Sequence, residues 1–159
     1  MNEIVLPKFM NFGAGAINKI TDILKKINCS RPIIITDKTM VDLKIIEPLE
    51  KSLTSIQLRY DIYKDTIPEP TAESIQEGVS LINKGKYDCI IAFGGGSPID
   101  SAKAMSILAK YGGNISDYKF PHINMKNGLP LIAIPTTAGT GSEATKFTII
   151  TNEKTDEKM

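Results

Sequence analysis

Short apolar runs alternate with amphipathic segments along this chain, and this alternation constrains its fold more than any other feature. Three runs are apolar and rich in β-branched residues, at positions 31–36, 89–93 and 131–134. Strands of a parallel sheet are buried on both faces, so they read as continuous apolar runs. We expect these runs to be parallel strands. Residues 55–60, where polar and apolar side chains alternate, are expected to form a weaker strand near an edge of the sheet.

The amphipathic segments between the runs have helical periodicity. Apolar residues recur at three- and four-residue spacings over about 16–27 and over 45–53. Thr71 is placed to cap a helix that ends near Gly85, and another helix is expected over about 98–109. Parallel strands joined by crossover helices indicate one α/β domain, a Rossmann-like layered parallel sheet with helices on both faces.

The two ends of the chain have weaker patterns. Residues 4–12 are expected to form a small strand pair, whose edge either pairs in a homo-oligomer or is covered by the rest of the protein. Residues 146–151 are expected to form a late strand. The polar residues that follow have no helical pattern, so we expect the sequence to be part of a longer protein.

Charge and composition exclude several classes of partner. The 159 residues include 19 basic and 18 acidic side chains, a net charge of +1, which gives no basic excess for nucleic acid or an anionic membrane. No signal peptide and no apolar stretch of about 18 residues occurs, so we expect a cytoplasmic protein. Cys29 and Cys89 are far apart in sequence, and we expect Cys89 to be a buried thiol in a reducing compartment.

Three successive glycines, Gly94 to Gly96, join an apolar run directly to a helical segment. Glycines are costly in chain entropy, so three together imply a sharp bend or a close approach of the backbone to a ligand. We expect Ser97 to cap the helix, Pro98 to occupy its first position and Asp100 to complete a capping box. The amino end of such a helix binds phosphate oxygens, although an ordinary tight turn is the alternative.

This loop differs from the GxGxxG dinucleotide fingerprint, in which a ribose-binding acid follows the glycines. Here Asp37 precedes them, at the end of the run over residues 31–36. If the strands are parallel, Asp37 lies on the same edge of the sheet as the glycines. It then either caps the next turn or accepts hydrogen bonds from an adenosine ribose, where its charge would repel a 2′-phosphate.

A second loop follows the run over residues 131–134 and reads PTTAGTGSE. Hydroxyl groups can donate to phosphate and ribose oxygens, and glycines let the backbone approach a flat ring. Thr136, Thr137, Thr140 and Ser142 could therefore line the far half of an extended ligand. Alone, this loop is weak evidence, because a cluster of Ser, Thr and Gly is usually a solvated turn; beside the three glycines it favours a binding site.

Two motifs, GGGSPIDSAKA at 94–104 and IPTTAGTGSEAT at 134–145, resemble the amino-terminal dinucleotide-binding domain of the iron-dependent (group III) alcohol dehydrogenases. FGAG near the start and the tripeptide ITD ending at Asp37 support the resemblance, which spans nearly the whole chain. It implies the dehydroquinate-synthase-like type of amino-terminal domain. It also implies an NAD(P)-dependent oxidoreductase that interconverts an alcohol with its aldehyde or ketone.

The resemblance also implies roles for individual residues. Asp37 would face the adenosine ribose, which favours NAD over NADP, and Lys158 would reach the nicotinamide ribose. The other residues that it places along the cofactor are Gly95, Gly96, Ser97, Asp100, Thr136, Thr137, Thr140, Thr145, Phe147 and Ile149. Glu69 stands between two prolines where many relatives carry Asn, so that contact differs here.

Members of this family bind Fe²⁺, sometimes replaced by Zn²⁺, through one Asp and three His on a helical second domain. The present chain has a single histidine, His122, in a polar loop, where we expect a surface residue. The resemblance therefore implies that the metal-binding domain follows residue 159. We expect the chain alone to bind the cofactor without catalysing the reaction.

Three other interpretations share parts of this pattern. Glycerol or glycerol-1-phosphate dehydrogenases and dehydroquinate-synthase-like lyases share the architecture but typically carry a less complete PTTAGTGSE-type loop. A kinase with a GGDG-type turn needs an acidic residue beside its glycines, where this chain has Gly96 and Ser97. A non-catalytic nucleotide-binding module stays open.

Overall fold

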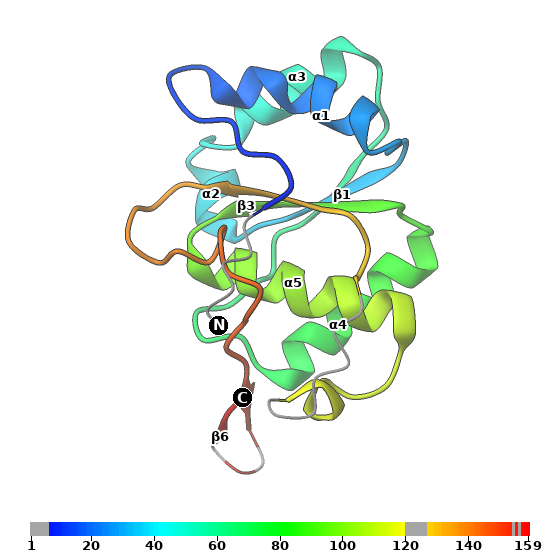
Figure 1. The fold of residues 1–159 in the computed structure, drawn as a ribbon, viewed down its shortest axis with the longest axis vertical. Helices are drawn as coiled ribbons and strands as arrows, with labels where there is room; N and C mark the ends of the chain where they lie inside the picture. The colour runs from blue at the N-terminus through cyan, green and yellow to red at the C-terminus, as the bar shows by residue number, and fades with distance from the viewer. Residues whose placement is uncertain (1–6, 120–126, 154, 156) are drawn as a thin grey trace, which may run out of the picture.

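The computed structural model describes residues 7–119, 127–153, 155 and 157–159 (Figure 1). At its centre is a four-stranded parallel sheet with the strand order β2-β1-β3-β4. The strands are β1 (Pro32–Ile35), β2 (Asp61–Tyr63), β3 (Cys89–Gly94) and β4 (Leu131–Pro135). The predicted α/β class and parallel sheet are confirmed.

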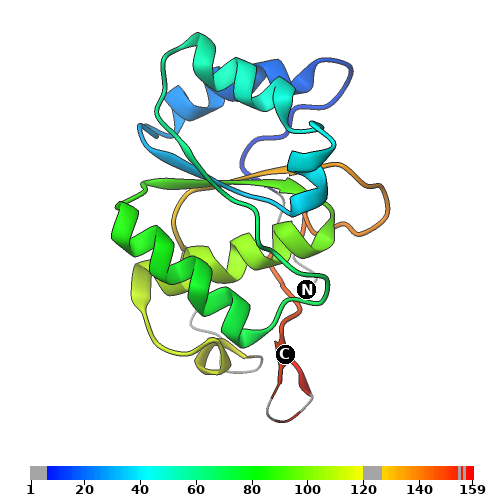
Figure 2. The same cartoon turned by 180° about the vertical axis from the view of Figure 1, so that it is seen from behind.

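Helices cover both faces of this sheet. Their bounds are η1 Ala16–Lys19, α1 Ile20–Lys26, α2 Lys38–Asp42, α3 Glu47–Ser55, α4 Ala72–Gly85, α5 Gly96–Tyr111 and η2 Ile115–Tyr118. Helices α1 and α3 lie on one face, and α4 and α5 lie on the other (Figures 1 and 2). The sheet is therefore the middle of three layers.

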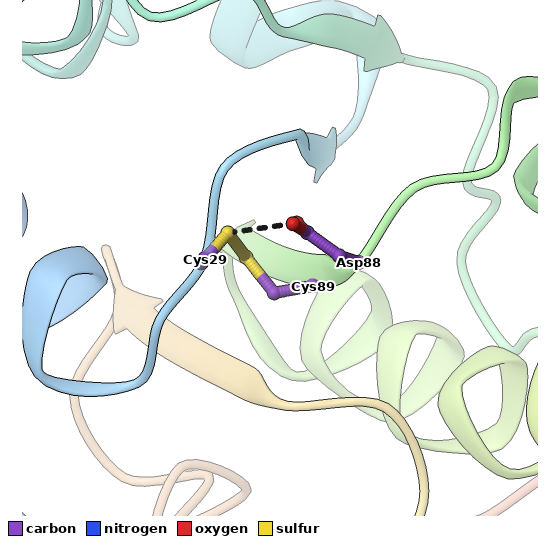
Figure 3. Close-up of side chains that lie close together, drawn as sticks. All are labelled: Cys29, Asp88 and Cys89. Carbon is purple, nitrogen blue, oxygen red and sulfur yellow. Dashed lines mark hydrogen bonds between the residues drawn. A yellow bond between two sulfur atoms is a disulfide. The ribbon is translucent and has the colours of Figure 1, made fainter.

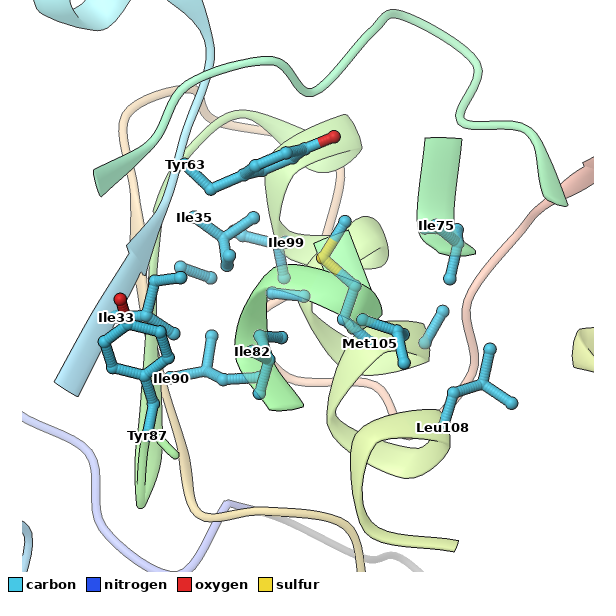
Figure 4. Packing of buried hydrophobic residues seen from close by; sticks show 14 of the residues in the cluster. Ile33, Ile35, Tyr63, Ile75, Ile82, Tyr87, Ile90, Ile99, Met105 and Leu108 are labelled. Atoms are coloured by element: carbon cyan, nitrogen blue, oxygen red, sulfur yellow. The ribbon is translucent and has the colours of Figure 1, made fainter. Parts of the chain in front are cut away.

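Side chains of the central strands explain why the strands are apolar throughout. Ile33 and Ile35 point into the core beneath α4 and α5 (Figure 4), whereas Ile34 points into the core beneath α1 and α3. All three are fully buried. Strand β4 is different, because it is an edge strand and Leu131 to Ile134 are only half-buried.

The edge strand on the other side begins later than expected. Residues 55–60 were expected to form it, but α3 continues to Ser55 and Gln57 turns the chain at a φ of 55°. The strand is β2, Asp61–Tyr63, paired with β1. The expectation of an edge strand is confirmed, and the expected residues are wrong because the alternating segment is used for the turn out of α3.

The helices agree more closely with the periodicity. The segment expected over 16–27 is η1 followed by α1, and α3 lies within the segment expected over 45–53 apart from its last two residues. Thr71 caps α4 through a reciprocal pair of hydrogen bonds with Ser74, and Lys86 ends the helix in the left-handed region. The five-residue α2 was not expected.

Both expected terminal strands are wrong where the structure describes them. Residues 7–12 form no strand, and residues 4–6 lie outside the described part of the chain. Residues 146–150 also form no strand, and only Thr151–Asn152 (β5) pairs with Glu157–Lys158 (β6). Buried Ile150 exchanges two backbone hydrogen bonds with Met159, of 2.8 and 2.7 Å, which ties the hairpin to the domain.

Cys89 is buried as expected, but it is bonded to Cys29 in a disulfide, so the expectation of a thiol at Cys89 is wrong (Figure 3). The register of β1 on β3 places Pro32 opposite Cys89, which brings the preceding loop over the start of β3. The two Cα atoms are 6.0 Å apart. Sequence separation hid this pairing, because parallel strands bring their amino ends together across an intervening crossover.

Candidate functional site

The carboxyl ends of β1, β3 and β4 lie side by side at one edge of the sheet. The Thr36 hydroxyl donates to the carbonyl of Phe93 at 2.7 Å, and the Thr136 N–H donates to the carbonyl of Gly94 at 2.9 Å. These bonds continue the sheet beyond the strands. The segments that begin at Asp37, Gly94 and Thr136 are therefore brought together, as the sequence predicted.

The glycine turn differs in detail from the expectation. Helix α5 begins at Gly96, with Gly95 at the N-cap position, so Ser97 does not cap it and Pro98 is its third residue. Asp100 accordingly lies beyond the capping position. The helix starts early because Gly94, at a φ of 145°, makes a bend that a residue with a side chain rarely adopts. No side chain forms a capping hydrogen bond at Gly95, and the first N–H groups of a helix have no partner within the helix.

The hydroxyl-rich loop packs directly on the glycines. A Cβ added to Gly95 would lie 3.2 Å from the Thr137 Oγ1 atom. A Cβ added to Gly96 would lie 3.3 Å from the Thr140 Cγ2 atom and 3.4 Å from the Ser142 Oγ atom. The absence of side chains at these two glycines therefore permits the close approach, and backbone N–H groups and hydroxyls form one polar cradle.

Asp37 lies at this cradle and also caps α2. Its Oδ1 atom accepts a hydrogen bond from the Met40 N–H at 3.1 Å, which confirms the capping interpretation. Its Oδ2 atom lies 3.5 Å from the position that a Cβ on Gly94 would occupy. One carboxylate oxygen is thus used locally, and the other lies beside the glycine turn.

Asp100 faces a lysine that the sequence analysis missed. The Lys103 ammonium lies 3.4 Å from the Asp100 Oδ1 atom, with the two side chains only 14% and 16% exposed. Burial lowers the pKa of Lys103, and Asp100 partly opposes this effect. An acid and a base three residues apart on a helix are neighbours, and that spacing was the signal available in the sequence.

Lys103 and Asp100 also contact the segment that follows the hydroxyl-rich loop. The ammonium donates to the Thr145 Oγ1 atom at 3.1 Å and to the Phe147 carbonyl at 2.8 Å. In return, the Thr148 hydroxyl donates to the Asp100 carbonyl at 2.8 Å. The segment of Thr145, Phe147 and Ile149 is therefore held beside α5, although it is not the strand that was expected.

Two residues of this edge that the sequence analysis treated separately are in contact. The Lys158 ammonium lies 3.5 Å from the Glu69 Oε2 atom, and both side chains are largely exposed. Glu69 has a φ of 51°, and the next residue, Pro70, accepts a hydrogen bond from the Thr151 N–H at 2.9 Å. The turn before α4 and the terminal hairpin thus meet at the carboxyl side of β2.

In the described part of the chain, one group of three side chains has the donor atoms of a possible metal site. It consists of Cys29, Asp88 and Cys89, at the opposite edge of the sheet. Its two sulfur atoms are joined in the disulfide, and His122 lies outside the described residues. With one histidine in 159 residues, this chain cannot supply the three imidazoles that the resemblance implies for iron.

Residues 7–159 match the protein family described as iron-containing alcohol dehydrogenase. The chain belongs to this family. This result confirms the resemblance drawn from the two motifs, and it favours an alcohol dehydrogenase over the other interpretations of the sequence.

Individual members of the iron-containing alcohol dehydrogenase family agree with this assignment. Alcohol dehydrogenase 4 of Saccharomyces cerevisiae is 36% identical over 154 residues, which cover 97% of this chain and 40% of the yeast protein. The structure of an alcohol dehydrogenase from Oenococcus oeni matches 99% of this chain and 42% of its own, at 36% identity and a TM-score of 0.93. Sulfoacetaldehyde reductase from Bifidobacterium kashiwanohense, solved in complex with NAD⁺, matches the same shares at 30% identity and a TM-score of 0.88.

The chain spans about 40% of the length of these family members. It corresponds to the amino-terminal region of an iron-containing alcohol dehydrogenase. None of the helices in the described ranges is both long and apolar enough to cross a membrane.

Proposed function

We propose that this chain is the dinucleotide-binding domain of an NAD-dependent alcohol dehydrogenase that interconverts an alcohol with its aldehyde or ketone. One observation carries the proposal: the loops that follow β3 and β4 form a polar cradle at the amino end of α5, and Asp37, which follows β1, lies beside it. A related reductase was solved in complex with NAD⁺, and another relative is described as an NAD-dependent methanol dehydrogenase.

In this proposal the pyrophosphate binds at the amino end of α5. The backbone N–H groups at Gly96 and Ser97 and the positive end of the helix dipole favour negative oxygens there. Gly95 and Gly96 let the facing loop pack against the backbone, and the hydroxyls of this loop then supply further donors beside the N–H groups. These residues bind the cofactor and orient it without carrying charge themselves.

The adenosine ribose lies at Asp37 in this proposal. The carboxylate already accepts one backbone hydrogen bond and keeps acceptor capacity for ribose hydroxyls. A 2′-phosphate at the same place would meet its negative charge, so we propose NAD rather than NADP. Thr136, Thr137, Thr140, Thr145, Phe147, Ile149 and Lys158 complete the proposed cofactor site.

The rest of the reaction is assigned to a part of the protein beyond this chain. Fe²⁺, or Zn²⁺ in its place, would polarise the alcohol oxygen and lower its pKa. A helical domain following residue 159 would carry that metal and most of the substrate pocket. We propose a small alcohol or aldehyde as the substrate, a homo-oligomer, and no nucleic-acid or membrane partner. We also propose a cytoplasmic location, although the Cys29–Cys89 disulfide is more typical of an oxidising compartment.

Titration of NADH into the 159-residue chain, followed by nicotinamide fluorescence, tests the proposal. Saturable binding is expected, and Gly96→Val should weaken it by at least tenfold because the new side chain meets Thr140 and Ser142. The control Ser80→Val places the same side chain on the exposed face of α4 and should bind like the wild type.

Circular dichroism of each variant shows whether it is folded. The absence of NADH binding by the wild-type chain at millimolar cofactor would overturn the proposed function. If the wild type and a folded Gly96→Val variant bind NADH equally well, the cradle does not bind the pyrophosphate as proposed.

A further inference from the structure

Lys103 is the most enclosed of the described lysines that form ion pairs, and its ammonium faces three acceptors. These are the Asp100 Oδ1 atom at 3.4 Å, the Thr145 Oγ1 atom at 3.1 Å and the Phe147 carbonyl at 2.8 Å. An ammonium has three donors, so each can be directed at one of these oxygens. Burying a cation is costly unless it is paired and hydrogen-bonded, so this arrangement depends on all of its partners.

The segment that Lys103 contacts has little other regular structure. Residues 146–149 belong to no helix or strand, and Phe147 and Ile149 are 56% and 60% exposed. The Thr148 hydroxyl bonds to the Asp100 carbonyl. A single turn of α5 therefore holds the segment at three successive points, Thr145, Phe147 and Thr148.

The same helix forms the amino end of the cofactor cradle. Lys103 lies seven residues after Gly96, about two helical turns along α5. Because a helix is stiff over two turns, the distance between the cradle and the anchored segment is set by α5. The cradle would hold the pyrophosphate, and the segment lies beyond the loop proposed to line the nicotinamide half.

We propose that Lys103, paired with Asp100, is a positioning residue that fastens residues 145–148 to α5 so that this segment flanks the nicotinamide half of the bound dinucleotide. This inference rests on the proposed function. Lys103 does not touch the cofactor; it acts through the segment that it holds. Loss of the anchor should therefore weaken binding of the nicotinamide half and leave the adenosine half in place.

Binding of NADH and of ADP to the 159-residue chain separates these two halves, because ADP has no nicotinamide. We expect Lys103→Met to weaken NADH binding by about tenfold, which corresponds to about 1.4 kcal/mol. ADP binding should change by less than about twofold, within the small effect expected of a distant substitution. Lys103→Arg, which keeps the charge and the donors, should recover most of the NADH affinity. The control Lys84→Met removes an exposed lysine of α4 and should bind both ligands normally.

Thr148→Val provides a second test that does not remove a buried charge. It replaces the hydroxyl that bonds to the Asp100 carbonyl with a methyl group of similar size. We expect a smaller loss of NADH affinity, again without loss of ADP affinity. Hydrogen exchange should be faster in both variants at the two hydrogen-bonded N–H groups that flank the segment, those of Thr145 and Ile150, which donate to the Gly141 and Met159 carbonyls.

The outcomes distinguish this inference from the proposed function. If the wild type does not bind NADH, the proposed function fails. If the wild type binds NADH and the folded variants Lys103→Met and Thr148→Val bind it equally well, only the positioning role is overturned. If NADH and ADP weaken to the same extent, Lys103 supports the domain as a whole and the inference is also overturned.

Discussion

Asp88 connects the loop before β1 to the start of β3 through a single carboxylate. It accepts hydrogen bonds from the N–H groups of Ser30 and Arg31 at 2.8 and 2.9 Å and from the Ser30 hydroxyl at 2.7 Å. Partial burial raises the pKa of Asp88, but these hydrogen bonds together outweigh it and the net pKa is lowered. A disulfide sulfur has no proton to donate, so the 3.1 Å contact of Cys29 in Figure 3 would be a hydrogen bond only after reduction.

A lowered pKa means that the ionised form of Asp88 stabilises the fold. Asp88 contributes its full stabilisation above a pH of about 3.9, the pKa of an aspartate in the unfolded chain. This stabilisation is lost as the pH falls through the lower pKa that Asp88 has in the folded protein. We expect Asp88→Asn to lower the free energy of unfolding by about 1–2 kcal/mol near neutral pH, less if solvent screens this partly exposed site. The difference should shrink towards zero in strong acid.

Urea unfolding of both proteins at several pH values measures this difference. The control Asp42→Asn changes an exposed carboxylate of α2 and should have about the same free energy of unfolding as the wild type near neutral pH. If Asp88→Asn lowers the free energy of unfolding equally at neutral and acidic pH, the role assigned to the ionised carboxylate is contradicted.

At the scale of elements, α4 shows how a local signal defines one end of a helix. The Thr71 hydroxyl accepts a hydrogen bond from the Ser74 N–H at 3.2 Å, and the Ser74 hydroxyl accepts one from the Thr71 N–H at 3.0 Å. These bonds satisfy N–H groups that the helix itself leaves unpaired. On its inner face, Ile75, Val79 and Ile82 are buried against the sheet and α5.

Removal of this cap should destabilise the domain without changing its fold. We expect Thr71→Ala to lower the free energy of unfolding by about 1 kcal/mol, because the Ser74 N–H loses the hydroxyl that accepts its hydrogen bond. Thr71→Ser keeps the hydroxyl and should retain most of the stability. Chemical unfolding followed by circular dichroism checks both variants; equal stability of Thr71→Ala and wild type would show that the cap is unimportant here.

At the scale of the whole molecule, the carboxyl and amino ends of the parallel strands have different roles. The proposed cofactor cradle lies where the parallel strands end, and the Cys29–Cys89 disulfide lies where they begin. The disulfide closes a loop of 60 residues that contains β1, α2, α3, β2 and α4. A crosslink that closes a loop of this length lowers the conformational entropy of the unfolded chain, which stabilises the folded state by about 4 kcal/mol.

Reduction should therefore weaken the fold and leave the cradle intact. We expect a reductant, or Cys29→Ser, to lower the free energy of unfolding by up to about 4 kcal/mol. At temperatures where the domain stays folded, NADH affinity should change little. Thermal unfolding with and without reductant measures the effect, and Cys29→Ser should not respond further to reductant. Equal stability of oxidised and reduced wild type would contradict the disulfide.

Much of this architecture follows from local pattern in the sequence. The runs that became β1 and β3 are apolar throughout because both faces of a central parallel strand are buried, and that requirement acts residue by residue. The cap at Thr71 and the bend at Gly94 also depend on neighbours in sequence. The two loop motifs sufficed to indicate the family.

Tertiary structure decided the features that depend on distant residues. The edge strand is Asp61–Tyr63 because pairing with β1 selects it, and Cys29 reaches Cys89 because the strand register aligns their loops. Lys103 is an anchor because the chain returns to α5 more than 40 residues later, at Phe147. Local sequence sets the preferences of a segment for helix, strand or turn, whereas contacts between remote segments exist only once the layers have packed.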